Sequence, residues 1–148
     1  MSLESSYPVK LNELYRDVIM DHYRRPRNKG RLEQPSVSVD LHNPVCGDEI
    51  TLQLLVEDGR IRQARFMGRG CSISQASASM MTQQLEGKTL AEAEEMLNRF
   101  KQMMRGDESA GEPLGDLYAL HGVAKFPVRV KCALLSWEAL ERSLEQLR

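Results

Sequence analysis

Residues 50–67 read ITLQLLVEDGRIRQARFM, and this stretch contains the pattern that decides the fold. Apolar and polar residues alternate on both sides of Asp58-Gly59, a pair that is typical of the tight turn in a β-hairpin. Residues 36–41 alternate in the same way. We therefore predict strands over 36–41, 50–57 and 60–67, joined in a small antiparallel sheet of three strands.

Helical patterns occupy most of the remaining chain. Apolar residues recur at helical spacing over 11–25, and Pro26 ends that segment. A helix rich in serine and alanine follows Cys71 and closes at Gly87. These helices would cover the sheet, which gives an α+β fold class in which a small three-stranded antiparallel sheet packs against several helices.

The second half of the chain carries clear helix-start signals. Thr89 and Glu92 form a capping box for a helix over 90–104. Residues 105–113 are predicted as a loop, followed by a short helix and a turn. Pro127 stands well for the first turn of a long final helix.

Size and charge restrict the class of protein. The 148 residues are 41% apolar, which suits one domain over 1–148 with one sizeable core. The net charge is -1, whereas a nucleic-acid-binding surface normally shows a basic excess. No apolar run reaches the roughly 20 residues of a membrane span, and no secretory signal is visible. We expect a cytoplasmic protein without nucleic-acid or membrane partners.

The chain has three cysteines, Cys46, Cys71 and Cys132. An odd and small number favours reduced thiols over a disulfide framework. Their spacing matches no compact zinc-finger pattern, so spacing alone leaves each of them as core filler, nucleophile or metal ligand.

The predicted hairpin brings two of these cysteines together. Simple pairing outward from the turn places Cys46 opposite Cys71, and Asp48 can be aimed at the same place. Cys71 also begins a helix, where the helix dipole favours a thiolate. Two thiolates and a carboxylate would form most of a tetrahedral Zn²⁺ site. Cys132 is the only candidate for a third thiolate, but it also lies on an apolar stripe of the last helix and could be ordinary core.

Four segments together resemble the IscU/SufU family of iron–sulfur cluster assembly proteins, and in the family's order. They are LYRDVIMDHYRRPRNKG (14–30), NPVCGDEI (43–50), GRGCSISQASASMM (68–81) and FPVRVKCALLSWEAL (126–140). The resemblance implies one α+β domain with a shared metal site. The ligands that it implies here are Cys46, Asp48, Cys71 and Cys132.

The details resemble the SufU branch of that family. Lys131 stands where IscU-type scaffolds have a histidine, the chaperone-recruiting Leu-Pro-Pro-Val-Lys motif is missing, and the segment over 111–125 is longer. This resemblance implies tight zinc binding and a zinc-dependent sulfurtransferase that takes persulfide sulfur from SufS, a pyridoxal-phosphate cysteine desulfurase. Cys46 is the candidate for attack on the persulfide, after a desulfurase histidine takes its place on the metal.

Several cations are candidates for supporting roles. Zn²⁺ with three thiolates and one carboxylate has a charge of about -2, so Lys131, Arg129 or Arg69 is expected to offset it, unless each is simply a solvent-facing charge. A basic cluster follows the first helix and is interpreted as a solvated helix end or as a docking patch for an acidic partner; its members are Arg24, Arg25, Arg27, Lys29 and Arg31.

Three functions therefore stay open. The first is the zinc-dependent sulfur acceptor, with a cysteine desulfurase and downstream Fe–S assembly proteins as partners. The second is a non-enzymatic scaffold on which a transient Fe–S cluster is built from the same ligands and passed to apo-proteins. The third is a structural zinc domain that serves as a binding module.

Overall fold

The computed structural model describes residues 15–45 and 47–148. Its sheet has three antiparallel strands in the order β1-β2-β3, with β1 over Val37–Asn43, β2 over Asp48–Glu57 and β3 over Arg60–Arg69. All three predicted strands are confirmed. Strand β2 begins two residues before the predicted start, and this extension makes Asp48 its first residue.

The register between β2 and β3 corrects the predicted pairing. Next to the turn, Val56 pairs with Ile61, but Leu55 pairs with Gln63, so β3 contains one extra residue at this point. This bulge shifts every later pair by one, and the ladder ends with Glu49 opposite Arg69. The simple pairing rule is therefore one residue out of register beyond the bulge, because a bulge leaves no clear signal in an alternating sequence. The predicted pairing of Cys46 with Cys71 itself falls outside the described residues.

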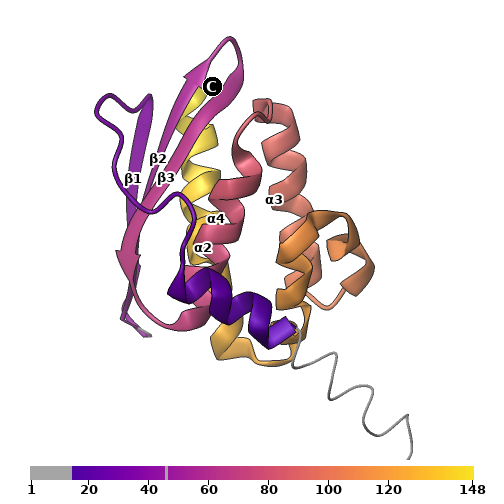
Figure 1. The fold of residues 1–148 in the computed structure, drawn as a ribbon. Coiled ribbons are helices and arrows are strands. Elements are labelled where there is room, and N and C mark those ends of the chain that lie inside the picture. The colour runs from indigo at the N-terminus through magenta and orange to yellow at the C-terminus, as the bar shows by residue number, and fades with distance from the viewer. Residues whose placement is uncertain (1–14, 46) are drawn as a thin grey trace, which may run out of the picture.

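Two helices cover one face of the sheet, and further helices form a second layer behind them (Figure 1). Helix α4, over Pro127–Leu147, packs on β1 and β2, and α2, over Ser72–Leu85, packs beside it on β3. Helix α3, over Leu90–Met104, lies on the far side of these two. The predicted starts of all three helices are confirmed, including Pro127 at the first turn of α4.

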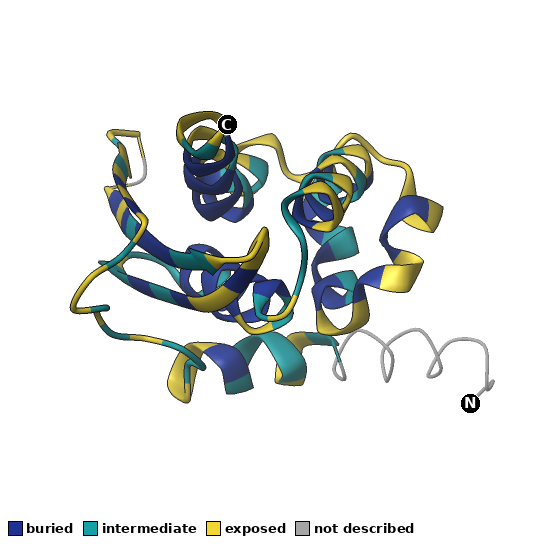
Figure 2. Ribbon diagram, turned by 90° about the horizontal axis from the view of Figure 1, so that it is seen from above, coloured by how far each residue is buried: buried dark blue, intermediate teal, exposed yellow. Residues whose placement is uncertain are grey.

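Helix α2 is buried on nearly all sides, which explains its composition (Figure 2). Every residue from Ser74 to Thr82 is buried, and serine and alanine are small enough for neighbouring elements to approach closely. The hydroxyl of Ser77 donates a hydrogen bond to the Ala133 carbonyl at 2.8 Å and accepts one from Trp137 Nε1 at 3.0 Å. These two bonds hold the first half of α4 against α2.

The segment η1, over Glu108–Lys125, corrects the predicted loop. It consists of 3₁₀-helical turns and is interrupted at Gly115, which has φ 59° and ψ -133°. The turns pack mainly against α3. The prediction of a loop over 105–113 was wrong for residues 108–113. Glycine and proline in this segment suggested an irregular chain, but packing against the rest of the protein holds it in 3₁₀-helical turns.

The N-terminal helix, which the structure describes over 15–24, is joined to the domain by a buried histidine. The Arg27 backbone N–H donates to the Ser79 hydroxyl at 2.8 Å, and that hydroxyl lies 2.8 Å from His22 Nδ1. The other ring nitrogen, Nε2, lies 3.0 Å from Asp116 Oδ2 on η1. His22 therefore connects this helix to both α2 and η1.

Part of the basic cluster is neutralised by a carboxylate of the helix that precedes it. Arg27 and Arg25 both bind the Asp21 carboxylate, at 2.7 and 2.8 Å, and the two guanidiniums hold the pKa of Asp21 below its usual range. For these two arginines the interpretation as a solvated helix end is the better one.

The capping box at the start of α3 gives a first test of the fold. The Thr89 hydroxyl accepts from the Glu92 N–H at 3.1 Å, and the Glu92 carboxylate accepts from the Thr89 N–H at 2.9 Å. We expect Thr89→Ala to lower the free energy of unfolding by about 1 kcal/mol. The Thr89 backbone N–H holds the pKa of Glu92 below its usual value, so this half of the box stabilises at neutral pH and is lost as acid protonates Glu92. Urea unfolding at neutral and acid pH measures both effects, and unchanged stability of Thr89→Ala at neutral pH would contradict the first.

Candidate metal centre

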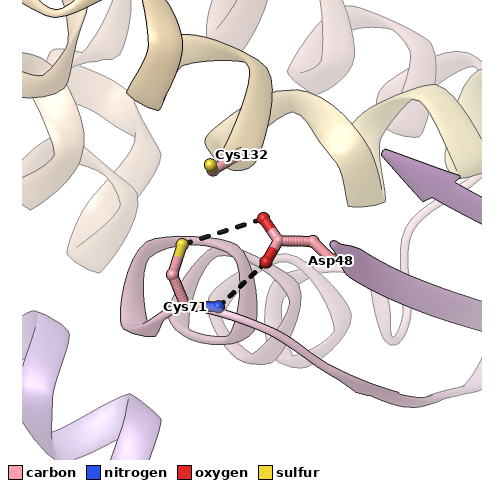
Figure 3. Close-up of side chains that lie close together, drawn as sticks. All are labelled: Asp48, Cys71 and Cys132. Carbon is pink, nitrogen blue, oxygen red and sulfur yellow. Dashed lines mark hydrogen bonds between the residues drawn. The ribbon is translucent and has the colours of Figure 1, made fainter. Parts of the chain in front are cut away.

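Three potential metal ligands from separate parts of the chain lie together at one end of the sheet. They are Asp48 at the start of β2, Cys71 directly before α2, and Cys132 in α4 (Figure 3). One ligand atom from each lies within 4.8 Å of the others. The Cys71 thiol donates a hydrogen bond to Asp48 Oδ2, with the sulfur 3.8 Å from that oxygen.

Asp48 is held in place by the backbone of the neighbouring loop. Its side chain is buried, since the residue is only 1% exposed, and its Oδ1 accepts a hydrogen bond from the Cys71 N–H at 2.9 Å. The β-bulge contributes directly, because one step beyond the Glu49–Arg69 pair the ladder brings Asp48 level with Gly70. The observed register thus places the aspartate beside the second cysteine motif.

Gly70 leaves room for the Asp48 side chain. A Cβ atom at this position would lie 2.7 Å from Asp48 Cγ and 2.8 Å from Ser74 Oγ. Any side chain here would therefore push the carboxylate out of its place. This steric requirement for glycine arises only when the two loops are packed together, so no local sequence pattern reveals it.

Cys71 is the N-cap residue of α2, as predicted. Its backbone is extended, with φ -71° and ψ 166°, and its carbonyl accepts bonds from Gln75 N–H and from the Ser74 hydroxyl. The thiol therefore lies at the positive end of the helix dipole, which favours negative charge. This position suits a thiolate ligand.

Cys132 joins the site because α4 is pinned to α2 at the adjacent residue, Ala133. Its thiol lies 3.7 Å from the Val128 carbonyl one turn earlier, and the residue is 3% exposed. The sequence left open whether Cys132 is core or ligand. In the structure it is buried like a core residue, yet its sulfur faces Asp48 and Cys71.

The donor set fits a zinc ion. In a tetrahedral site with Zn–O of about 2.0 Å and Zn–S of about 2.3 Å, donor atoms are about 3.3–3.8 Å apart. Separations of at most 4.8 Å need only small side-chain rotations to reach this range. Two sulfurs and one carboxylate oxygen are also ligands that zinc accepts, with one position left for a fourth donor. Cys46, the predicted fourth ligand, lies outside the described residues.

The candidate supporting cations lie on the surface near the site. Lys131 and Arg129 precede Cys132 on α4 and are both exposed. Arg69 is 81% exposed in its side chain and forms an ion pair with Glu49 at 3.1 Å. Their effect on a bound metal stays a prediction.

The three histidines lie outside the candidate metal cluster. His22 is buried between helices, as described above. His121 stacks on Tyr118 with ring centroids 4.5 Å apart and pairs with Glu108 at 3.0 Å. His42 lies on β1 opposite Glu49. In the part of the chain that the structure describes, the candidate metal cluster contains no histidine.

Fold and site together define a class: a small α+β domain with a candidate metal centre of two cysteines and one aspartate at one end of its sheet. Residues 14–144 match the sequence model of the NifU-like N-terminal domain. The chain belongs to this family, the IscU/SufU group of iron–sulfur cluster assembly proteins.

Named relatives cover nearly the whole chain. The chain is 51% identical to the zinc-dependent sulfurtransferase SufU of Bacillus subtilis, over 94% of this chain and 95% of the relative. It is 43% identical to the iron–sulfur cluster assembly scaffold protein IscU of Streptococcus pyogenes, over 93% of this chain and 86% of the relative.

A solved structure supports the fold. The crystal structure described as an iron–sulfur cluster assembly scaffold protein for the SUF system, from Fervidobacterium islandicum, superposes with a TM-score of 0.76 at 38% identity. The match covers 86% of this chain and 93% of that one.

Proposed function

We propose that this protein is a zinc-dependent sulfur acceptor in iron–sulfur cluster assembly, which takes persulfide sulfur from a cysteine desulfurase. The observation that carries the proposal is the convergence of Asp48, Cys71 and Cys132 within 4.8 Å, a donor set that suits zinc. The identity of 51% to a zinc-dependent sulfurtransferase supports it. Cys46 completes the proposed ligand set.

The protein's own residues prepare the thiols for this reaction. The Cys71 N–H orients the Asp48 carboxylate, and the start of α2 favours negative charge on Cys71. Zinc, when bound, would keep the thiols deprotonated and so protect them from oxidation. Exposed Arg129 and Lys131 are proposed to offset the negative charge of the filled site.

The sulfur-transfer step needs no other reactant. The Cys46 thiolate attacks the outer sulfur of the desulfurase persulfide, and one S–S bond forms as the other breaks. The desulfurase cysteine leaves as a thiolate, and Cys46 keeps the persulfide. Since free thiols persist in a reducing compartment, we propose that the protein works in the cytoplasm, where downstream Fe–S assembly proteins would receive the sulfur.

A desulfurase turnover assay tests the proposal. We expect the zinc form to stimulate a SufS-type desulfurase and the metal-free form to lose most of that effect, and mass spectrometry to find the persulfide on Cys46. Persulfide on Cys71 or Cys132 alone would contradict the role of Cys46. Protein purified without air that carries iron and sulfide and absorbs visible light would favour a scaffold, like the relatives named IscU. A structural zinc domain would bind zinc without any stimulation.

A further inference from the structure

A groove next to the candidate metal centre takes no part in the proposed sulfur-transfer step. Its volume is about 680 Å³, and its walls come from the N-terminal helix, the end of η1 and the first turns of α2 and α4. Ser72 and Arg129 line it, and these residues lie close in the chain to Cys71 and Cys132. A molecule held in this groove would therefore lie beside the starts of the two helices that hold Cys71 and Cys132.

The groove is strongly cationic, although the whole chain has a net charge of only -1. Arg16, Lys125 and Arg129 line it, and among the described lining residues there is no aspartate or glutamate. Across the described residues, none of these three side chains forms an ion pair. The first turns of α2 and α4 add the positive ends of two helix dipoles. The groove is thus prepared for negative charge.

The same groove offers apolar surface. Ile19, Ile73 and Phe126 line it, and Phe126 remains 59% exposed. Val128, one turn before Cys132 on α4, is also 62% exposed. Large apolar residues that stay exposed around one site are typical of a surface that a protein partner covers.

We infer that this groove docks an acidic segment of the protein that delivers the sulfur, with an apolar side chain of that segment placed among Ile19, Ile73 and Phe126. The inference rests on the proposed function and identifies where the partner binds. The groove has cations around an apolar centre. A partner segment with carboxylates around one apolar side chain would match it in both charge and shape. Docking here would bring the donor persulfide to the thiols without using any metal ligand for recognition.

The experiment measures desulfurase turnover against the concentration of this protein, with a SufS-type desulfurase as the probe. In the double variant Arg16→Glu/Lys125→Glu, we expect the half-saturating concentration to rise by about tenfold or more, with the maximal rate within about twofold of wild type. The half-saturating concentration of this variant should also depend less on salt, because the variant has lost the charge attraction that salt screens. The matched control is Arg62→Glu/Arg105→Glu, which makes the same change of charge at two exposed residues outside the groove.

A second variant separates docking from folding. Phe126 is the N-cap residue of α4 and makes no side-chain capping bond, so Phe126→Ser introduces a favourable cap. We expect this variant to keep or gain thermal stability and to keep its zinc, yet to need a several-fold higher concentration for half-saturation.

The outcomes distinguish the two proposals. If wild type stimulates the desulfurase and both groove variants saturate at the wild-type concentration, the groove inference is wrong and the sulfur-acceptor function stands. If wild type gives no stimulation, the proposed function fails, and the docking inference falls with it. A control variant that weakens saturation as much as the groove variants would show only a general effect of net charge, and it too would overturn the inference.

Discussion

Asp48→Ala should bind zinc at least about 100-fold more weakly than wild type, since it loses a ligand and the group that orders the others. In the structure one of its carboxylate oxygens lies within 4.8 Å of both sulfurs, and its Oδ1 accepts a hydrogen bond from the Cys71 N–H. Alanine removes the oxygen donor and leaves that N–H without its partner. Chelator competition on purified protein measures the affinity directly, without relying on activity.

Two further variants test whether the loss of zinc affinity is specific to the Asp48 carboxylate. Asp48→Asn keeps an oxygen that can accept from the Cys71 N–H but is a much weaker ligand, so we expect native folding with most of the zinc affinity lost. Glu49→Ala is the matched control, because Glu49 is the next residue of β2 and its side chain pairs with exposed Arg69. Wild-type zinc affinity in Asp48→Ala would show that the aspartate is not a ligand.

Gly70→Ala is expected to disable the site without removing any donor. The new methyl group would lie 2.7 Å from Asp48 Cγ and 2.8 Å from Ser74 Oγ, both shorter than normal contacts. Because Asp48 is buried, its carboxylate must rotate away from the thiols. We expect zinc affinity to fall by about tenfold or more, as when the support of a ligand is lost. The same chelator competition detects it.

Backbone strain needs its own control, since Gly70 has φ +155°. Gly106 has φ +108° and open space around its Cβ position, so Gly106→Ala adds strain without a steric contact. Each alanine is expected to reduce the free energy of unfolding by about 1–3 kcal/mol. Only Gly70→Ala should lose zinc. Equal zinc affinity in the two variants would contradict the steric role of Gly70.

Local patterns in the sequence were sufficient for most of the secondary structure. Asp58-Gly59 predicts the hairpin, Thr89 with Glu92 predicts the start of α3, and Pro127 predicts the start of α4. Each signal acts within a few residues, through turn geometry, capping bonds or a fixed φ, so it is visible without knowledge of the rest of the fold. The resemblance to the IscU/SufU family extended this local information to the family and the ligand set.

The site itself depends on contacts between distant parts of the chain. A bulge in β3 sets the register that brings Asp48 beside Gly70, and Cys132 reaches the site because Ser77 and Trp137 hold α4 on α2. An apolar stripe in the sequence cannot distinguish a core cysteine from a buried ligand, because both need the same buried helix face. The sequence by itself determined the three strands, the starts of the long helices and the candidate residues for the chemistry. The tertiary structure decided which of those residues meet, because register and helix packing are set by the whole core.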